Sequence, residues 1–100
     1  MKLWVDDIRP APEGYIWCKS VNETVNKIIG TETEQKTIHV IDIDHDAGDY
    51  SCDGGDYIKI LDWLEETGRC YPIRLHSANP VGKRNMRAII QRNGWLEVYG

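Results

Sequence analysis

The chain has 100 residues, a net charge of −4 and a hydrophobic share of 41%, which is the size and composition of one globular domain spanning residues 1–100. It lacks an apolar run of the ~18 residues that a membrane span needs, and its N-terminus enters a strand pattern without a signal peptide, so we expect a cytoplasmic protein with no membrane partner. The acidic balance disfavours long double-stranded nucleic acid, although a small phosphate-bearing ligand needs only a local basic patch.

The three cysteines are odd in number and widely spaced. Cys18, Cys52 and Cys70 show no C-x-x-C pattern, so neither a disulfide framework nor a zinc knuckle is expected. A reducing compartment fits this cysteine usage.

The first two predicted strands are separated by a short connection. Lys2–Val5 predicts a strand that ends at Asp6 and Asp7, and Tyr15–Lys19 predicts the next. Only Ile8–Gly14 lies between them, fewer residues than the dozen or so of a helical crossover. The strands are therefore either an antiparallel pair with a long loop or a pair in which an extended segment replaces a helix.

A helix and the central strand follow. Ser20 and Glu23 form a capping box that opens a helix, and Gly30 is its expected end. The β-branched run Thr37–Asp44 predicts an interior parallel strand. The buried face of the helix is expected to contain Val21, Val25, Ile28 and Ile29.

The second half alternates in the same way. A Gly- and Asp-rich loop over Ala47–Gly55 lacks the closing Glu of an EF-hand. The elements predicted after it are a helix capped by Asp56 and ending near Thr67, a strand over Tyr71–Leu75, a helix from Asn79-Pro80 to about Arg92, and a last strand over Trp95–Tyr99. Strands alternating with helices predict a three-layer α/β domain with a mostly parallel five-stranded sheet and three helices.

Polar side chains follow three of these strands at the point where each ends. In open α/β sheets, ligands bind at the carboxyl ends of the strands. One site is therefore expected where the three groups converge: Asp6-Asp7, Asp44-His45-Asp46, and His76-Ser77-Ala78-Asn79.

These positions resemble the receiver domains of response regulators, which carry an acidic pair, an Asp and a Ser-Ala at these strand ends. Three stretches are closer to a divergent branch, the cyclic-phosphate processing receiver domains: LWVDDIRPAP (Leu3–Pro12), DHD (Asp44–Asp46) and HSANPVGKRNM (His76–Met86). The resemblance covers nearly the whole chain. It implies a flavodoxin-like sheet of order 2-1-3-4-5 without the first and last receiver helices, and activity on a cyclic phosphate of an RNA end or a nucleotide.

Two features depart from ordinary receivers. The segment Trp95–Gly100 has no lysine to match the one that contacts the phosphoryl group at the end of a receiver's fifth strand. Asp42 lies on the same face of its strand as Asp44, where an apolar residue is expected. The first departure disfavours phosphoryl signalling.

The carboxylates of Asp6, Asp7 and Asp44 would repel one another if unpaired, and at least one pKa should rise. Mg²⁺ would relieve that repulsion, with Asp46 either closing the metal shell or orienting His45. The alternative is that the Asp6-Asp7 pair is a turn that faces solvent.

His45 and His76 follow adjacent strands about 4.8 Å apart. Cleavage of a cyclic phosphate needs a base for water and an acid for the departing oxygen, and histidine suits both tasks near neutral pH. We expect these two histidines, with Asp44, to be catalytic. A single histidine at a strand end is more often structural, and mid-strand His39 is expected to have no catalytic part.

The expected phosphate seat is the start of the last helix, where free N–H groups favour anions. Cations there oppose the helix dipole, which makes sense if they hold a phosphate; a solvated basic face is the alternative. The ligand-binding candidates are Ser77, Asn79, Lys83, Arg84 and Arg9. Ser77 is expected to donate a hydrogen bond, because no Ser-His-Asp order is visible.

Three functions remain open from the sequence. The first is a small phosphoesterase acting on a cyclic phosphate of an RNA end or a nucleotide. The second is a module that binds a nucleotide or a protein without turnover, and the third is a phosphoacceptor domain that uses Asp44. The sequence specifies no oligomeric state.

Overall fold

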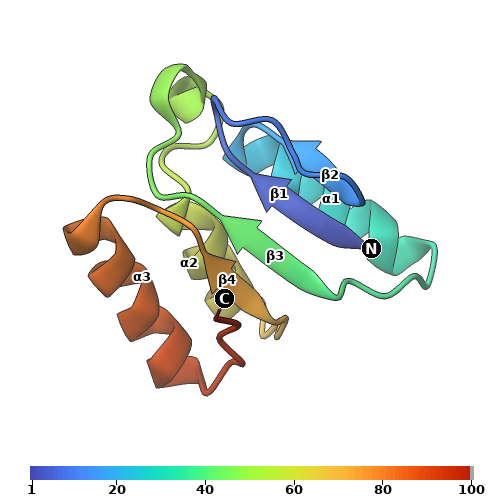
Figure 1. The fold of residues 1–100 in the computed structure, drawn as a ribbon. Helices are drawn as coiled ribbons and strands as arrows, with labels where there is room; N and C mark the ends of the chain where they lie inside the picture. Colours follow the sequence, from blue (N-terminus) through green and yellow to red (C-terminus); the bar gives the residue numbers. More distant parts are fainter. Residues whose placement is uncertain (100) are drawn as a thin grey trace.

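The computed structural model describes residues 1–99. Four strands form a single sheet in the order β2-β1-β3-β4, and every neighbouring pair is parallel. The α/β class and the three helices are as predicted, and the first two strands are parallel. The elements in Figure 1 are β1 (Lys2–Val5), β2 (Tyr15–Cys18), α1 (Val21–Thr33), β3 (Val40–Ile43), the 3-10 helix η1 (Gly48–Cys52), α2 (Ile58–Glu66), β4 (Ile73–Leu75) and α3 (Pro80–Asn93).

The connection between β1 and β2 is an extended segment in place of a crossover helix. The Asp6 carboxylate fixes its start, because Oδ1 accepts the backbone N–H groups of Ile8 and Arg9, both at 2.9 Å. Its end is fixed by the Tyr15 N–H, which donates to the Pro12 carbonyl at 3.1 Å. These local bonds satisfy the backbone that a helix would otherwise have satisfied.

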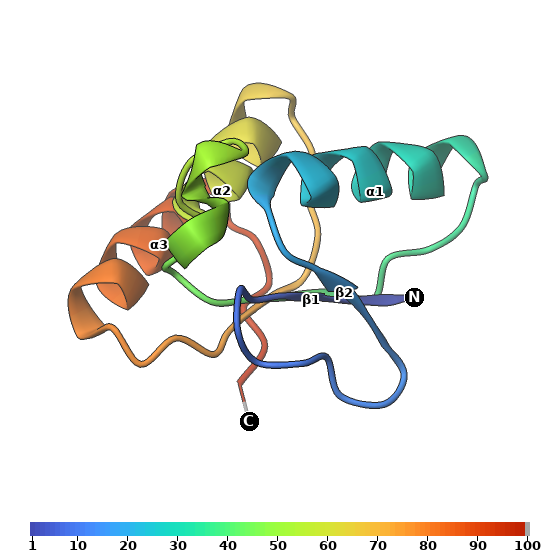
Figure 2. The same cartoon turned by 90° about the horizontal axis from the view of Figure 1, so that it is seen from above.

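All three helices pack on one face of the sheet (Figure 2). Alternate strand residues such as Leu3, Ile41 and Ile73 point to this face and are fully buried. The opposite face carries Trp4 and Asp42, and no helix within residues 1–99 covers it. The expected third layer is therefore wrong: within residues 1–99 the domain has two layers, because all three helices pack on the same face of the sheet (Figure 2).

The expected fifth strand is reduced to one bridge beside β4. Ile73 pairs in parallel with Glu97; its N–H donates to the Leu96 carbonyl at 2.9 Å, and its carbonyl accepts the Val98 N–H at 2.7 Å. Because β4 has only three residues, little ladder is available for a fifth strand. The sheet thus has four strands within the described chain.

The start of α1 is as predicted, whereas its end is not. The Ser20 hydroxyl accepts the Glu23 N–H at 3.0 Å, which caps the helix. The helix continues through Gly30 to Thr33, so the expected stop at Gly30 is wrong. Ile29, expected on the buried face, is 42% exposed.

The two later helices begin in different ways. The Asn79 side chain accepts the Gly82 N–H at 3.0 Å and caps α3 as expected. Asp56 does not cap α2; its Oδ1 accepts the Ala47 N–H at 3.2 Å instead, and the helix begins at Ile58. Asp56 therefore holds the loop that follows β3.

The assignment of the hydrophobic core can be tested at the central strand β3. Ile41 of β3 is 0% exposed, and its replacement by alanine should lower the free energy of unfolding by about 2–5 kcal/mol through lost burial and a cavity. Chemical denaturation measures this loss. The control is Ile29→Ala, which removes the same atoms from a largely exposed site and should cost about 0.5 kcal/mol or less. Equal losses would contradict this assignment of the core.

Candidate functional site

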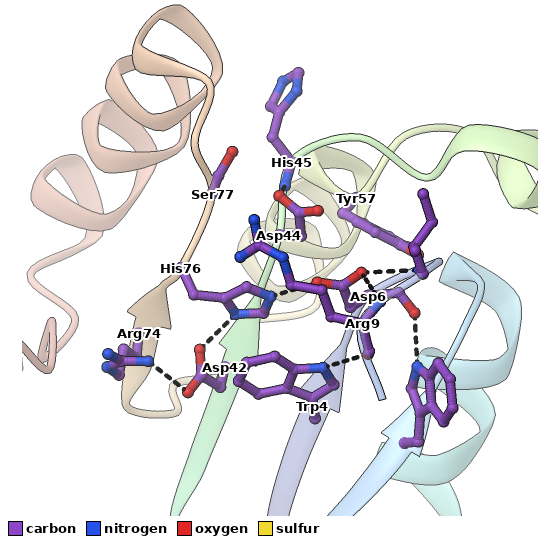
Figure 3. Close-up of polar contacts among 12 residues, drawn as sticks. Trp4, Asp6, Arg9, Asp42, Asp44, His45, Tyr57, Arg74, His76 and Ser77 are labelled. Atoms are coloured by element: carbon purple, nitrogen blue, oxygen red, sulfur yellow. Dashed lines mark hydrogen bonds and ion pairs between the residues drawn. The ribbon is translucent and has the colours of Figure 1, made fainter. Parts of the chain in front are cut away.

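The site is organised around His76, the first residue after β4. Its Nδ1 lies 2.7 Å from Oδ1 of Asp42, and its Nε2 lies 2.9 Å from Oδ2 of Asp6 (Figure 3). The His76 side chain is 6% exposed and each carboxylate 1%. A neutral imidazole has a single N–H, whereas two carboxylate contacts require a donor on each nitrogen. The geometry therefore favours the doubly protonated imidazolium.

Two further side chains hold this imidazole in place. The Trp4 indole stacks on it with ring centroids 3.9 Å apart and planes at 4°. Oδ2 of Asp42 accepts a hydrogen bond from the Arg74 guanidinium at 3.0 Å. Trp4, Asp42 and Arg74 occupy the same row of β1, β3 and β4. Asp42, the acid found where an apolar residue is expected, thus holds the ring of His76 in place.

Asp6 is held as an anion. Burial raises the pKa of its carboxyl, but the N–H groups of Arg9 and Ile8 and the His76 imidazole outweigh burial, and the net pKa is lowered. Its backbone carbonyl accepts the Trp17 indole N–H at 2.7 Å. Asp6 therefore serves as a fixed acceptor rather than a proton donor.

The carboxyl of Asp7 has a raised pKa, in contrast to that of Asp6. Burial raises the pKa of its carboxyl, and the nearby charges of Asp6 and Asp44 raise it further. This is the effect that crowding of carboxylates predicts. Oδ2 of Asp7 lies so close to Gly48 that a Cβ atom there would overlap with it, and the positive φ of Gly48, 55°, also favours glycine.

Asp6, Asp44 and His76 each present one ligand atom, and these atoms lie within 4.8 Å of one another. Mg²⁺ prefers carboxylate and water oxygens, so Asp6 and Asp44 fit such an ion. Both nitrogens of His76 already contact carboxylates, which makes it a poor ligand for this metal. Asp7 and Asp46, also expected as ligands, do not belong to this group.

His45 lies at the end of β3 but does not face His76. Its backbone N–H donates to Oδ1 of Asp44 at 2.8 Å, and its Nδ1 lies 2.9 Å from Oδ1 of Asp46. Asp46 is therefore the residue that orients the ring. In Figure 3 the His45 ring points away from His76, and it packs against Gly82 of α3. The two imidazoles are not in contact.

The residues expected to bind a phosphate do not come together in one place. Ser77 is buried, and its hydroxyl accepts the Asn79 N–H at 3.0 Å, so both residues shape the turn before α3. Lys83 and Arg84 lie on the outer side of α3, in a hollow of ≈ 430 Å³ that Arg87 also lines. They do not join the His76 cluster.

Arg9, another expected ligand residue, lies beside the cluster in the connection after β1 (Figure 3). Its backbone N–H binds Asp6, and in Figure 3 its side chain extends from the connection after β1 toward Asp44. Asp42 stood out in the sequence as an acid where an apolar residue is expected, but no pattern indicated the parts played by Trp4 and Arg74.

A parallel α/β sheet with strand order 2-1-3-4, an acidic pair after β1 and polar residues after β3 and β4 defines a domain of the receiver type. The family model described as Cyclic-phosphate processing Receiver domain matches residues 1–92. The chain belongs to this family, and its resemblance to it in sequence is confirmed. Neither the curated proteins nor the solved structures contain a match. Within residues 1–99, no helix has both the length and the apolar character to cross a membrane.

Gly82 tests how His45 is held. A Cβ atom at position 82 would overlap with the His45 ring, so Gly82→Ala should displace the ring from Asp46 and shift its NMR signals. The matched control is Gly30→Ala, also within a helix, where nothing lies within 4 Å of an added Cβ. That control should leave His45 unchanged and stabilise α1 by up to about 1 kcal/mol. Unchanged His45 signals in Gly82→Ala would contradict the packing described.

Asp7 should give the domain a pH-dependent stability. Since its pKa is raised on folding, the native state keeps this proton to higher pH than the unfolded chain, and the resulting stability is lost as the pH rises through the folded pKa. Asp7→Asn cannot ionise, so it should exceed the wild type in free energy of unfolding at pH 7 but not below about pH 4, near the unfolded pKa. Urea denaturation at the two pH values measures the difference. A wild type more stable than the variant at pH 7 would refute the expectation.

Proposed function

We propose that this domain hydrolyses a cyclic phosphate, at an RNA end or in a cyclic nucleotide. The observation that carries the proposal is the buried imidazole of His76, held between Asp42 and Asp6 at the carboxyl ends of the strands. Membership of a family associated with cyclic-phosphate processing supports the same chemistry. The reaction adds water across one P–O bond of the ring.

His76 is the proposed general acid. As an imidazolium it carries a proton on Nε2, which can pass to the ribose oxygen as the P–O bond breaks. Asp42 binds Nδ1 and fixes the ring plane, while the Arg74 guanidinium donates a hydrogen bond to the other oxygen of Asp42. The Asp6 carboxylate accepts a hydrogen bond from Nε2 of His76 until that proton passes to the leaving oxygen.

His45 is the proposed general base. Its contact with Asp46 through Nδ1 leaves Nε2 to accept a proton from the attacking water. Its ring lies on the α3 side of Asp44, so a phosphate between the two histidines would meet the start of α3. Ser77 and Asn79 would donate hydrogen bonds there, with Arg9, Lys83 and Arg84 as longer-range cations.

Asp6 and Asp44 would hold a Mg²⁺ ion if the reaction uses one, and such an ion would supply positive charge to the phosphate oxygens. Asp7 is close enough to both ligands for their charges to raise its pKa, and it would complete the shell through water, whereas Asp46 contacts His45. Removal of the metal by EDTA separates this role from that of the histidines.

Binding without turnover is the second candidate. It is favoured by the occlusion of His76, whose side chain is only 6% exposed and whose nitrogens are both engaged. In that case the same residues would bind a nucleotide or a protein. A phosphoacceptor role of Asp44 is a weaker candidate, because the segment after α3 has no lysine.

The test is hydrolysis of 2′,3′- and 3′,5′-cyclic nucleotides and of an oligonucleotide ending in a cyclic phosphate, each with Mg²⁺ and with EDTA. His76→Ala and His45→Ala should each reduce turnover by about 10²–10⁴-fold. The control is His39→Ala, because His39 lies at the far end of β3, where its N–H binds the Met1 carbonyl. Asp42→Asn should lower kcat more than it raises KM.

Three outcomes separate the candidates. Turnover that survives both histidine variants would refute the acid–base pair. Saturable binding without turnover, abolished by the same variants, would replace the enzyme with the binding module. A mass increase after incubation with acetyl phosphate, lost in Asp44→Asn, would instead identify a phosphoacceptor.

A further inference from the structure

The strand β2 forms one edge of the sheet, and part of its outer backbone has no partner. The Cys18 carbonyl accepts the Asp6 N–H at 3.3 Å, so Cys18 and Ile16 face β1. Residues at alternate positions therefore turn their backbone groups outward. These are Tyr15, Trp17 and Lys19.

Some of these outward groups are already bonded. The Tyr15 N–H donates to Pro12, the Lys19 N–H donates to the Glu23 carboxylate, and the Lys19 carbonyl accepts the Tyr57 hydroxyl at 2.6 Å. Within residues 1–99, no hydrogen bond satisfies the N–H or carbonyl of Trp17 or the carbonyl of Tyr15. These three groups match the hydrogen-bonding pattern of one added strand.

A groove of ≈ 830 Å³ runs along this edge, between β2 and α1. Figure 2 shows α1 lying along the β2 side of the sheet. Apolar atoms of Ile16, Cys18 and Val25 line the groove, together with the amides of Asn22 and Asn26. A strand laid against β2 would place alternate side chains in this groove, and an apolar side chain suits the first three residues.

The lysines at this edge indicate the charge of a partner that would bind there. Lys27 lines the groove, while Lys19 and Lys2 lie over the rings of Trp17 and Tyr15 on the open face. None of these three lysines forms an ion pair with a carboxylate in residues 1–99. Two acids also line the groove: the Asp53 carboxylate accepts hydrogen bonds from the side chains of Ser20 and Asn22, and the Glu23 carboxylate accepts one from the Lys19 backbone N–H. The groove therefore carries charges of both signs, whereas Lys2 and Lys19 make the open-face side of this edge basic.

We propose that β2 is a docking edge for an extended acidic peptide segment of a partner protein. The segment pairs with the Trp17 and Tyr15 backbone groups as an additional strand. Its apolar side chains enter the groove beside α1, and its acidic side chains meet Lys2 and Lys19 on the other face. Docking leaves His76 and its carboxylates in place, so the inference does not depend on the proposed hydrolysis.

The test uses a synthetic peptide of alternating glutamate and valine, titrated to ~1 mM and followed by backbone amide NMR. The amide signals of β2 and of the groove side of α1 should shift. Two control peptides carry lysine in place of glutamate, or methyl groups on the backbone nitrogens that would donate. Each should bind about tenfold more weakly or not at all.

Two charge variants complete the test. Lys2→Glu with Lys19→Glu should weaken binding of the acidic peptide at least about tenfold. Lys59→Glu, an exposed lysine on α2, should leave it unchanged. The proposal is overturned if β2 signals do not move, if the lysine peptide binds equally well, or if a single-stranded oligonucleotide shifts the same signals more strongly than the acidic peptide.

Discussion

The clamp on His76 is the constraint on which the rest of this domain depends. Asp42 lies within β3 and Asp6 directly follows β1, and each is only 1% exposed. A buried carboxylate is costly unless it is paired and hydrogen-bonded. The imidazolium and the Arg74 guanidinium supply two positive charges against these two negative ones. Loss of one partner would leave an uncompensated charge, at a cost of about 3–5 kcal/mol. The clamp thereby ties β1, β3 and β4 together.

The two-layer architecture leaves one face of the sheet without helices, and the His76 cluster lies on that face. With all helices on one face, the other face is free to carry charged and aromatic side chains. Trp4 and His76 cover the middle of that face by stacking, and Arg74, 30% exposed, reaches from the clamp toward solvent. A third layer would have required apolar residues at these positions. The packing of the described helices on one face and the polar character of the other face are therefore linked.

Local patterns predicted the elements well, because each depends on neighbours in sequence. The caps at Ser20 and Asn79 are examples. The convergence of Asp6, Asp44 and His76 could be predicted because the carboxyl ends of parallel strands meet at one edge of the sheet. What depended on long-range packing could not be predicted in the same way. The His45 ring can face α3 because Gly82 has no Cβ atom to overlap with it. The expected fifth strand is only a single bridge because β4 has three residues. The three-layer expectation came from the alternation of strands and helices, and this alternation does not specify on which face of the sheet each helix packs.

The row formed by Trp4, Asp42 and Arg74 has an evolutionary consequence. Register places these residues side by side, and Asp42 contacts both Arg74 and His76. An aliphatic residue at position 42 would remove the carboxylate that these two side chains share, so substitution there should favour change at the other two. Among receiver-type sequences, these positions should change as a linked set, and an acid at position 42 would distinguish chains that keep this chemistry from those that only keep the fold.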